Sequence, residues 1–204
     1  MLSIQSIIRA VKGLIFKYQV DSGIDLKLNK INGPDRKPKL VVSLTSYGRR
    51  VNNVVYYTLI SLFKQSLMPD RIILWLNENN WNKDNIPENL KKLQKLGLEI
   101  YFCKDIRSYT KLVPALTLCK NDIIITVDDD VIYPSDLIEK LYNAYLEEPQ
   151  KIHSGLAREI SFTEGKINPY NSWLPAQISS LHPFPTGYGG ILYPPNTLHQ
   201  DVTN

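Results

Sequence analysis

The sequence predicts an α/β fold with a mainly parallel sheet that is flanked by helices. Short apolar runs rich in β-branched residues alternate along the chain with segments of helical period, and the run at residues 123–127 is β-branched throughout and does not alternate between apolar and polar residues. Strands that alternate with helices imply right-handed crossovers and a parallel sheet. An uninterrupted apolar strand is typical of a sheet that is covered on both faces.

Residues 1–37 are predicted to form a basic amphipathic helix followed by a polar linker. Apolar residues recur at helical spacing over residues 1–20, and the charges there are Arg9, Lys12 and Lys17. Two interpretations stay open for this helix: peripheral contact with a membrane, or packing on the domain or on a partner chain. No apolar run reaches the roughly 18 residues that a spanning helix needs.

Residues 38–204 are predicted to be one domain whose charges nearly cancel. Residues 1–39 carry eight Lys or Arg against three Asp, whereas residues 40–204 carry sixteen Lys or Arg against seventeen Asp or Glu. Without a basic face, the domain is not expected to bind nucleic acid. Cys103 and Cys119 lie in or beside apolar segments without metal-ligand spacing, which favours reduced cysteines and a cytoplasmic protein.

Local sequence signals mark the ends of the predicted helices and strands of this domain. Apolar residues lie on one face of the helix that precedes Pro69, which breaks the chain. Pro87 is typical of the first turn of a helix, and Gly97 of the position after the last turn. The predicted strands are 40–44, 71–76, 98–103 and 123–127, and the predicted helices are 51–66, 87–97, 111–119 and 135–147.

Asp128, Asp129 and Asp130 follow the buried strand directly. If the backbone stays extended, Asp128 and Asp130 project to one side and Asp129 to the other. Clustered carboxylates repel one another unless a cation neutralises them, and oxygen ligands suit a hard ion such as Mg²⁺ or Mn²⁺. Ligands of open α/β sheets collect at the carboxyl ends of strands, so a metal site is predicted here. The alternative is that these acids only stabilise the start of the following helix.

The pattern becomes irregular after residue 157. Residues 160–186 contain several prolines and aromatic residues, and Gly187, Tyr188, Gly189 and Gly190 follow. Three glycines in four positions let the backbone approach a ligand closely, and long loops above a rigid sheet commonly carry binding groups. The alternative is a surface loop held by prolines. The sequence has no GxGxxG or Walker-type loop, so phosphate would be bound by a metal and side chains.

The first strand with its polar turn, the three acids and the glycines resemble the nucleotide-sugar-dependent glycosyltransferases of the GT-A fold. The resemblance is closest to family-2-like bacterial enzymes of polysaccharide assembly, and it covers about residues 38–200. It implies that Asp128 and Asp130 hold the metal, and that residues 187–190 lie near the donor sugar and the acceptor. It also implies that the nucleotide contacts Thr45, Ser46, Tyr47, Lys111, Asp128 and Asp129.

The resemblance further implies a metal-dependent, hexosyltransferase-like enzyme. Its donor is expected to be a UDP-sugar with Mn²⁺ or Mg²⁺, and its acceptor a saccharide or a lipid-linked molecule. The enzyme would work in the cytoplasm, including the inner face of the membrane. Asp201 is the only acid after the glycines and would take the proton of the acceptor as catalytic base. Members of the family continue beyond this point, so we expect a truncated domain.

Two other functions compete with this one. A sugar nucleotidyltransferase would use the same carboxylates, but such enzymes resemble proteins with a glycine-rich basic loop after the first strand, and residues 45–50 contain a single glycine. A nucleotide-sugar binding module without turnover is the third hypothesis, and the expected truncation favours it.

Overall fold

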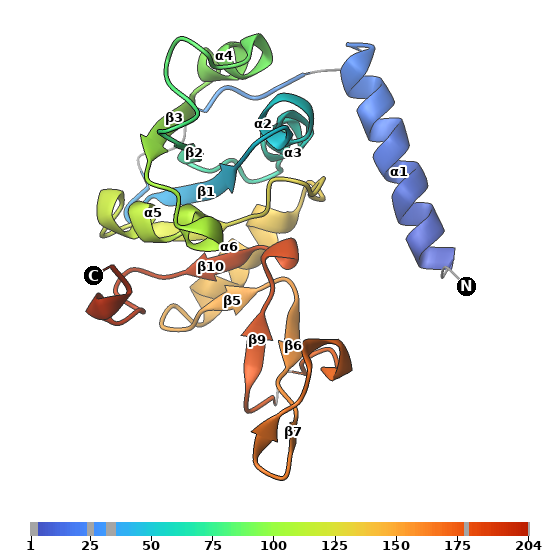
Figure 1. Ribbon diagram of the computed structural model, residues 1–204, viewed down its shortest axis with the longest axis vertical. Coiled ribbons are helices and arrows are strands. Elements are labelled where there is room, and N and C mark those ends of the chain that lie inside the picture. The colour runs from blue at the N-terminus through green and yellow to red at the C-terminus, as the bar shows by residue number, and fades with distance from the viewer. Residues whose placement is uncertain (1–3, 24–26, 32–35, 178–179, 204) are drawn as a thin grey trace.

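A computed structural model describes residues 4–23, 27–31, 36–177 and 180–203 of the chain. Its centre is a six-stranded sheet with the order β3-β2-β1-β4-β10-β5 (Figure 1). The first four strands of that order run parallel, which confirms the predicted mainly parallel sheet. Antiparallel β10 and β5 extend it on one side. The strands are β1 Leu40–Ser46, β2 Arg71–Asn77, β3 Leu98–Cys103, β4 Ile123–Thr126, β5 His153–Ser154 and β10 Ile191–Tyr193.

Helices cover both faces of the sheet. The larger core lies between one face and helices α3, α4 and α6, and the smaller core lies between the other face and α5. In β4, Ile123 and Ile125 belong to the larger core and Ile124 to the smaller one. This division explains why the first three positions of the strand are all apolar. The helices are α1 Ile4–Asp21, α2 Arg50–Asn53, α3 Val55–Leu62, α4 Glu88–Gln94, α5 Val113–Leu118 and α6 Leu137–Glu147.

The register of β1 and β4 positions the acids. Ser43 pairs with Thr126, and the amide of Val127 donates to the carbonyl of Ser43 at 3.1 Å. Strand β4 ends at Thr126, whereas β1 continues to Ser46, so the end of β1 lies beside the segment that carries Asp128. The carboxyl ends of the two central strands meet at one edge of the sheet, as the parallel topology requires.

The predicted helix 51–66 is two helices, because the chain bends at Val54 (φ −122°, ψ −53°) between α2 and α3. Helix α3 carries two buried hydroxyls that bind the loop after β4. Thr58 Oγ1 donates to the carbonyl of Asp129 at 2.8 Å, and the amide of Tyr133 donates to Ser61 Oγ at 3.1 Å. These polar residues inside an apolar helix face anchor the acidic segment.

The described parts of the predicted linker lie along the domain. Leu28 and Ile31 pack against the larger core, and the amide of Ile31 donates to the carbonyl of Leu96 at 2.9 Å. Arg36 forms an ion pair with Asp70 at 3.0 Å. These two apolar side chains, three residues apart, hold an otherwise polar segment on the domain. The polar composition of the segment gave no sign of this packing.

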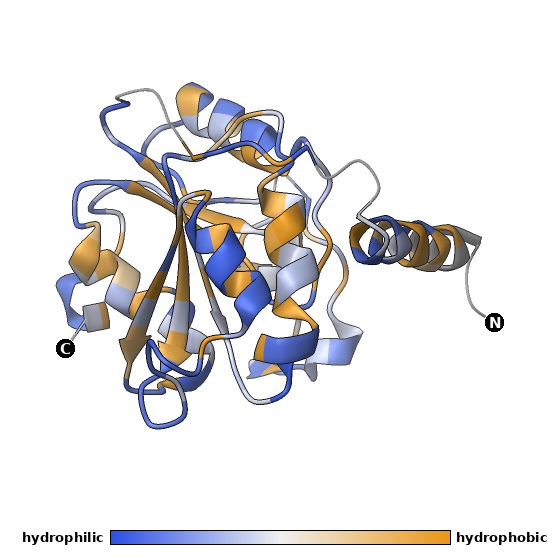
Figure 2. Cartoon of the chain, turned by 90° about the horizontal axis from the view of Figure 1, so that it is seen from above, coloured by the Kyte–Doolittle hydropathy of each residue, from blue (hydrophilic) through white to orange (hydrophobic). Residues whose placement is uncertain are grey.

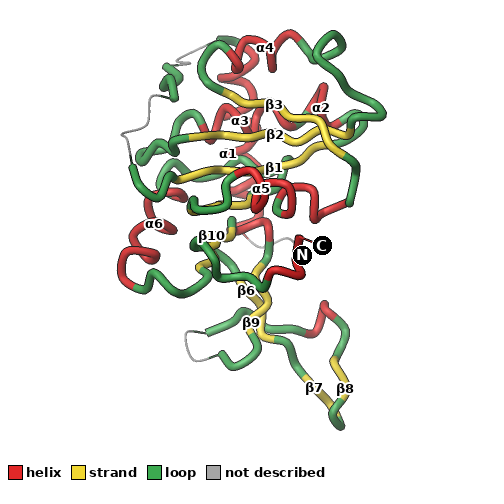
Figure 3. Tube along the Cα trace, turned by 90° about the vertical axis from the view of Figure 1, so that its left-hand side faces the viewer, coloured by secondary structure: helices red, strands yellow, loops and turns green. Residues whose placement is uncertain are grey.

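An arm extends away from the sheet below β10, as the tube in Figure 3 shows. We define the arm as residues 157–185. Its strands have only two or three residues each, too few for a period to be read from the sequence. Strand β6 (Ala157–Glu159) pairs with β9 (Pro183–Pro185), and β7 (Phe162–Thr163) pairs with β8 (Lys166–Ile167). Short 3₁₀ helices are η1 Arg107–Lys111, η2 Tyr170–Ser172, η3 Gly187–Gly189 and η4 Gln200–Thr203.

Helix α1 lies beside the domain and is seen almost end-on in Figure 2. Residues 4–21 confirm the predicted helix, whose expected first three residues lie outside the described part of the chain. None of the helices that the structure describes combines the length and the apolar character needed to cross a bilayer.

Candidate functional site

Three carboxylates with unequal exposure lie at the carboxyl end of β4. The side chains of Asp128 and Asp130 are 33% and 42% exposed, whereas that of Asp129 is 6% exposed. This difference agrees with the predicted alternation, which places Asp129 apart from its neighbours. We call these residues the acidic triplet.

Asp129 anchors the turn in which the triplet lies. Its carboxylate accepts a hydrogen bond from Ser46 Oγ at 2.6 Å and another from Arg50 Nη1 at 2.7 Å. A buried carboxylate needs such partners, because an unpaired charge in the interior is strongly unfavourable. Asp129 was predicted to contact the nucleotide; in the structure Ser46 and Arg50 bind its two oxygens, and the prediction of a nucleotide contact stays a prediction.

Arg50 links two members of the triplet. Its Nη2 lies 2.9 Å from Asp130 Oδ2 while Nη1 holds Asp129, and the guanidinium lies over the Tyr47 ring at 5.2 Å from the centroid. Burial alone would lower the pKa of Arg50, but the two carboxylates raise it above its ordinary value. The sequence placed Arg50 only in a polar turn. Its role depends on the fold, which brings residue 50 next to residue 129.

Lys111 approaches the triplet from the other side. Its Nζ lies 2.5 Å from Asp128 Oδ1. The carbonyl of Lys111 accepts a hydrogen bond from Ser43 Oγ at 2.6 Å, which fixes the end of η1 against β1. Each exposed carboxylate of the triplet thus carries one cation.

Tyr133 connects the triplet to the glycine loop, residues 187–190. The amide of Asp128 donates to the Tyr133 hydroxyl at 2.8 Å, and this hydroxyl donates to the carbonyl of Gly187 at 3.3 Å. Burial raises the pKa of Tyr133 well above its ordinary value, so the hydroxyl keeps its proton. Sequence analysis missed Tyr133, since an aromatic residue before a helix is usually a core residue.

The glycine loop meets the acidic triplet at Gly187. A Cβ at Gly187 would be 2.4 Å from Asp128 Oδ1 and 2.6 Å from Lys111 Nζ. A Cβ at Gly189 would be 2.4 Å from the backbone nitrogen of Leu156. At Gly189 the close neighbour is backbone, so glycine is required there, whereas at Gly187 the close atoms are the flexible ends of Asp128 and Lys111; Gly190 has φ of +72°.

A pocket of about 560 Å³ opens at this edge of the sheet, and we call it the acidic pocket. It brings together the six residues predicted to contact the nucleotide and the predicted metal ligand Asp130. The hydroxyl of Thr45 donates to the carbonyl of Trp75 at 3.0 Å, whereas Tyr47 is exposed. Lining residues that were not predicted are Arg50, Asn77, Asp105, Arg107, Ser108, Thr110 and Val127.

The donor set of the acidic pocket fits a hard divalent ion that is shared with a phosphate ligand. Within the described ranges, no three His, Cys, Asp or Glu side chains are arranged to hold a metal by themselves. Mg²⁺ and Mn²⁺ bind few protein carboxylates when phosphate oxygens complete the shell. Asp128 and Asp130 are exposed enough to be those carboxylates, whereas Asp129 is occupied by Ser46 and Arg50.

Asp201, the predicted catalytic base, lies in η4 with its side chain exposed. Its Oδ2 lies 3.1 Å from His199 Nδ1, and η4 packs on α5. The structure does not place Asp201 among the described residues that line the acidic pocket. Asp201 follows the glycine loop closely in sequence, but strand β10 lies between them and carries the chain back along the sheet. Sequence position alone therefore could not show that Asp201 lies outside the pocket.

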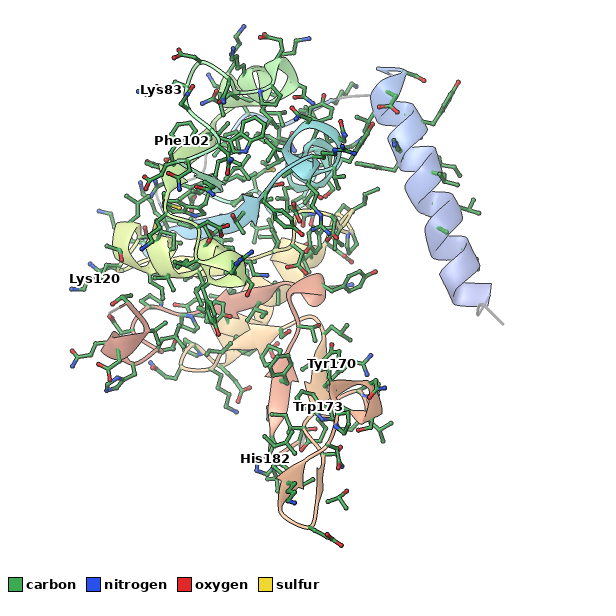
Figure 4. All side chains as sticks on the ribbon, viewed as in Figure 1. Lys83, Phe102, Lys120, Tyr170, Trp173 and His182 are labelled. Carbon is green, nitrogen blue, oxygen red and sulfur yellow. The ribbon has the colours of Figure 1, made fainter. Side chains whose placement is uncertain are left out.

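The aromatic residues of the arm pack on one another. Tyr170 and Trp173 lie on the arm beside the sheet domain (Figure 4), with ring centroids 5.3 Å apart. Phe184 completes the group at 5.4 Å from Trp173, and Arg158 lies over the Tyr170 ring. These rings form a small core for the arm, so their presence in the sequence does not by itself indicate a binding loop.

Comparison with known proteins identifies one family model, described as glycosyl transferase family 2, which matches residues 42–197. No curated protein is significantly similar to the chain. A 4-diphosphocytidyl-2C-methyl-D-erythritol synthase has a similar structure, with a TM-score of 0.50 and 10% identity over 80% of this chain and 79% of that one. At this identity the similarity concerns the fold, and it supports the α/β architecture.

Two further structures are more distant. A CMP:2-keto-3-deoxy-manno-octonic acid synthetase complexed with CTP has a TM-score of 0.49 and 10% identity, and the match covers 78% of this chain and 74% of that one. A mannosyltransferase from Pyrobaculum calidifontis, in complex with GDP-Man and Mn²⁺, has a TM-score of 0.42 and 14% identity, with 74% and 43% covered.

Proposed function

The chain belongs to glycosyl transferase family 2, and from this premise we propose that it transfers a sugar from a nucleoside diphosphate to a saccharide or lipid-linked acceptor. The role we propose is surface polysaccharide assembly in a bacterium, at the inner face of the membrane. One observation supports the proposal most strongly. Asp128 and Asp130 reach one pocket at the carboxyl ends of β1 and β4, each paired with a cation that suits a diphosphate.

The acidic pocket offers separate surfaces for the parts of a nucleotide sugar. Thr45, Ser46 and Tyr47 line it after β1, where we place the nucleoside, with a UDP-sugar as the proposed donor. Lys111 and Arg50 would bind the diphosphate as a point charge and as a planar fork. Asp129 holds Arg50 in place before any ligand binds, so the cation is oriented in advance, which is how preorganised electrostatics act.

Asp128 and Asp130 would hold Mn²⁺ or Mg²⁺, and this ion would stabilise the negative charge that develops on the departing phosphate. The carboxylates are fixed for this task through their surroundings. Tyr133 holds the backbone of Asp128, and Thr58 holds the carbonyl of Asp129. Gly187 covers Asp128 closely, which would exclude water from that side of the donor.

The transfer step also needs a base for the hydroxyl of the acceptor. We keep Asp201 as the proposed base, although η4 would have to move toward the acidic pocket. An Asp201→Asn variant should then lose sugar transfer while its affinity for the nucleotide stays unchanged. Transfer at the wild-type rate by this variant would remove Asp201 from the mechanism.

Donor turnover tests the proposed function. The protein is incubated with a panel of nucleotide sugars and Mn²⁺, and the release of nucleoside diphosphate is measured. We expect release from one donor, and its loss in Asp130→Asn but not in Asp84→Asn, which changes an exposed acid that does not line the pocket. Release of pyrophosphate from a nucleoside triphosphate would instead identify a nucleotidyltransferase. Nucleotide binding without any turnover would instead favour the hypothesis of a nucleotide-sugar binding module.

A further inference from the structure

Helix α1 is held on the domain by one of its faces. Val20 is buried, and Phe16 packs against the larger core. Asp21 Oδ1 accepts a hydrogen bond from the Tyr57 hydroxyl at 2.6 Å, and Lys17 Nζ lies 5.1 Å from the centroid of the Tyr57 ring. These contacts fix the carboxyl-terminal half of the helix against α3 and thereby determine which face points away from the domain.

The opposite face of α1 is apolar and exposed. Because successive residues of a helix are about 100° apart, its five large apolar residues fall on an arc of roughly 120°. Lys12 and Lys17 lie on the two flanks of this arc, and residues 4–20 contain no acid. The residues of this free face are Ile8, Val11, Leu14, Ile15 and Tyr18, which are 48–68% exposed.

A large pocket lies between α1 and α6, and we call it the helix pocket. It measures about 1090 Å³, and apolar side chains contribute most of its wall. Gly13 and Phe16 of α1 face Leu141 and Ala144 of α6 across it. Asp130 lines this pocket as well as the acidic pocket. An apolar cavity therefore adjoins the carboxylate beside which the donor would react.

We propose that the helix pocket binds the apolar chain of a lipid-linked phosphate acceptor, which an anionic membrane presents while the free face of α1 rests on that membrane. This inference rests on the proposed glycosyltransferase function and names its acceptor class. A saccharide alone would gain nothing from an apolar cavity beside Asp130, whereas an alkyl chain gains stability from every buried methylene.

Charge selects the membrane as the occupant of the free face. An interfacial helix has an apolar arc flanked by basic residues whose ammonium groups reach the lipid headgroups. Lys12 has this position on one flank, whereas Lys17 on the other flank lies over the Tyr57 ring. The excess of five positive charges in residues 1–39 favours an anionic bilayer and disfavours a second copy of the same basic segment. Lys12 lines the helix pocket and would attract the phosphate of the acceptor, whereas Lys140 at the same pocket is paired with Asp136 at 2.7 Å.

Vesicle flotation tests the membrane part of the proposal. The full chain is mixed with vesicles of phosphatidylcholine, or of phosphatidylcholine with phosphatidylglycerol. We expect binding only to the anionic vesicles, weakened by salt, and about tenfold weaker binding for the double variant Leu14→Gln/Tyr18→Gln. Ala10→Gln changes an exposed residue outside the arc and should bind like the wild type. Equal binding of both variants would overturn the role of the free face.

Titration with dodecyl phosphate, below the concentration at which it forms micelles, tests the helix pocket. Ala144→Trp fills the pocket and should weaken this binding at least about tenfold, since a large side chain replaces the alkyl chain. Asn143→Trp adds the same ring on the exposed neighbouring position and should leave it unchanged. Inorganic phosphate should bind much more weakly than dodecyl phosphate. Equal binding of inorganic phosphate, or equal effects of both tryptophans, would contradict the proposal.

The same variants separate the two proposals. Manganese-dependent nucleotide binding is measured with Ala144→Trp and Asn143→Trp alongside the lipid titration. Retained nucleotide binding without any affinity for dodecyl phosphate would overturn the inference about the acceptor and leave the proposed function intact. Absence of manganese-dependent nucleotide binding in the wild-type protein would overturn the proposed function itself.

Discussion

Replacement of Asp129 by asparagine separates the structural acid of the triplet from the two acids proposed to bind metal. The Asp129 carboxylate is almost fully buried and accepts charge-assisted hydrogen bonds from Arg50 at 2.7 Å and from Ser46 at 2.6 Å. The variant keeps the shape of the side chain but removes its charge. Ser46 can rotate its hydroxyl to accept from the new amide, so the loss falls mainly on the bond with Arg50.

The expected loss follows from these contacts. A hydrogen bond to a charged group contributes about 1.5–3 kcal/mol, and breaking a fully buried ion pair costs about 3–5 kcal/mol. Arg50 is partly exposed and keeps Asp130, so the lower range applies. We expect Asp129→Asn to lower the free energy of unfolding by about 2 kcal/mol. For a domain of this size that corresponds to a fall in Tm of about 4–8 °C.

Urea unfolding followed by circular dichroism measures this change, with Asp130→Asn as the matched control. Asp130 is exposed, and an exposed ion pair contributes about 0–1 kcal/mol, so the control should unfold close to the wild type. Asp129→Asn should lose more stability than Asp130→Asn, whereas Asp130→Asn should lose more affinity for the nucleotide in the presence of manganese. A stable Asp129→Asn together with a destabilised Asp130→Asn would refute the assignment of the anchor.

Three further outcomes follow from the contacts of the site and the sheet. Tyr133→Phe removes the hydroxyl that the amide of Asp128 needs, so unfolding should become about 1–2 kcal/mol easier and nucleotide affinity should fall, as urea titration and calorimetry would show. Gly187→Ala should displace the flexible ends of Asp128 and Lys111 and weaken nucleotide binding at nearly unchanged stability. In Gly189→Ala the new methyl group meets backbone, so this variant should lower the Tm. A larger fall in Tm for Gly187→Ala than for Gly189→Ala would contradict the geometry. Burial alone would raise the pKa of Glu99, but Arg71 holds it below its ordinary value. Because the folded pKa lies below the unfolded one, this stabilisation is complete above about pH 4.5 and disappears as the pH falls through the folded pKa. The wild type should therefore lose more stability than Glu99→Gln between about pH 5 and pH 3, and parallel curves would exclude this role of the pair.

The parallel sheet could be predicted because its strands leave strong signals. Residues 123–126 are apolar at each of the first three positions, and the structure divides these side chains between two cores. Strands β5 and β10 escaped prediction, since two or three residues at a sheet edge show no period. The single helix predicted over 51–66 also failed at Val54, where a backbone bend has no sequence signal.

The site could be predicted only as far as chain position determines it. Asp128 and Asp130 follow a buried strand, and the glycine loop needs residues without side chains, so both could be found from the sequence. Arg50 and Tyr133 could not, because their roles come from partners 79 and 54 residues away. Lys111 was predicted from the resemblance alone, and the structure gives it a partner in Asp128.

Calorimetric titration with a panel of nucleoside diphosphates, with and without Mn²⁺, tests the central claim most directly. The account predicts that one diphosphate binds, that this binding requires Mn²⁺, and that Asp130→Asn abolishes the requirement together with the binding. Binding of the same strength without Mn²⁺, or in Asp130→Asn, would contradict the claim that the acidic pocket is a metal-dependent nucleotide site.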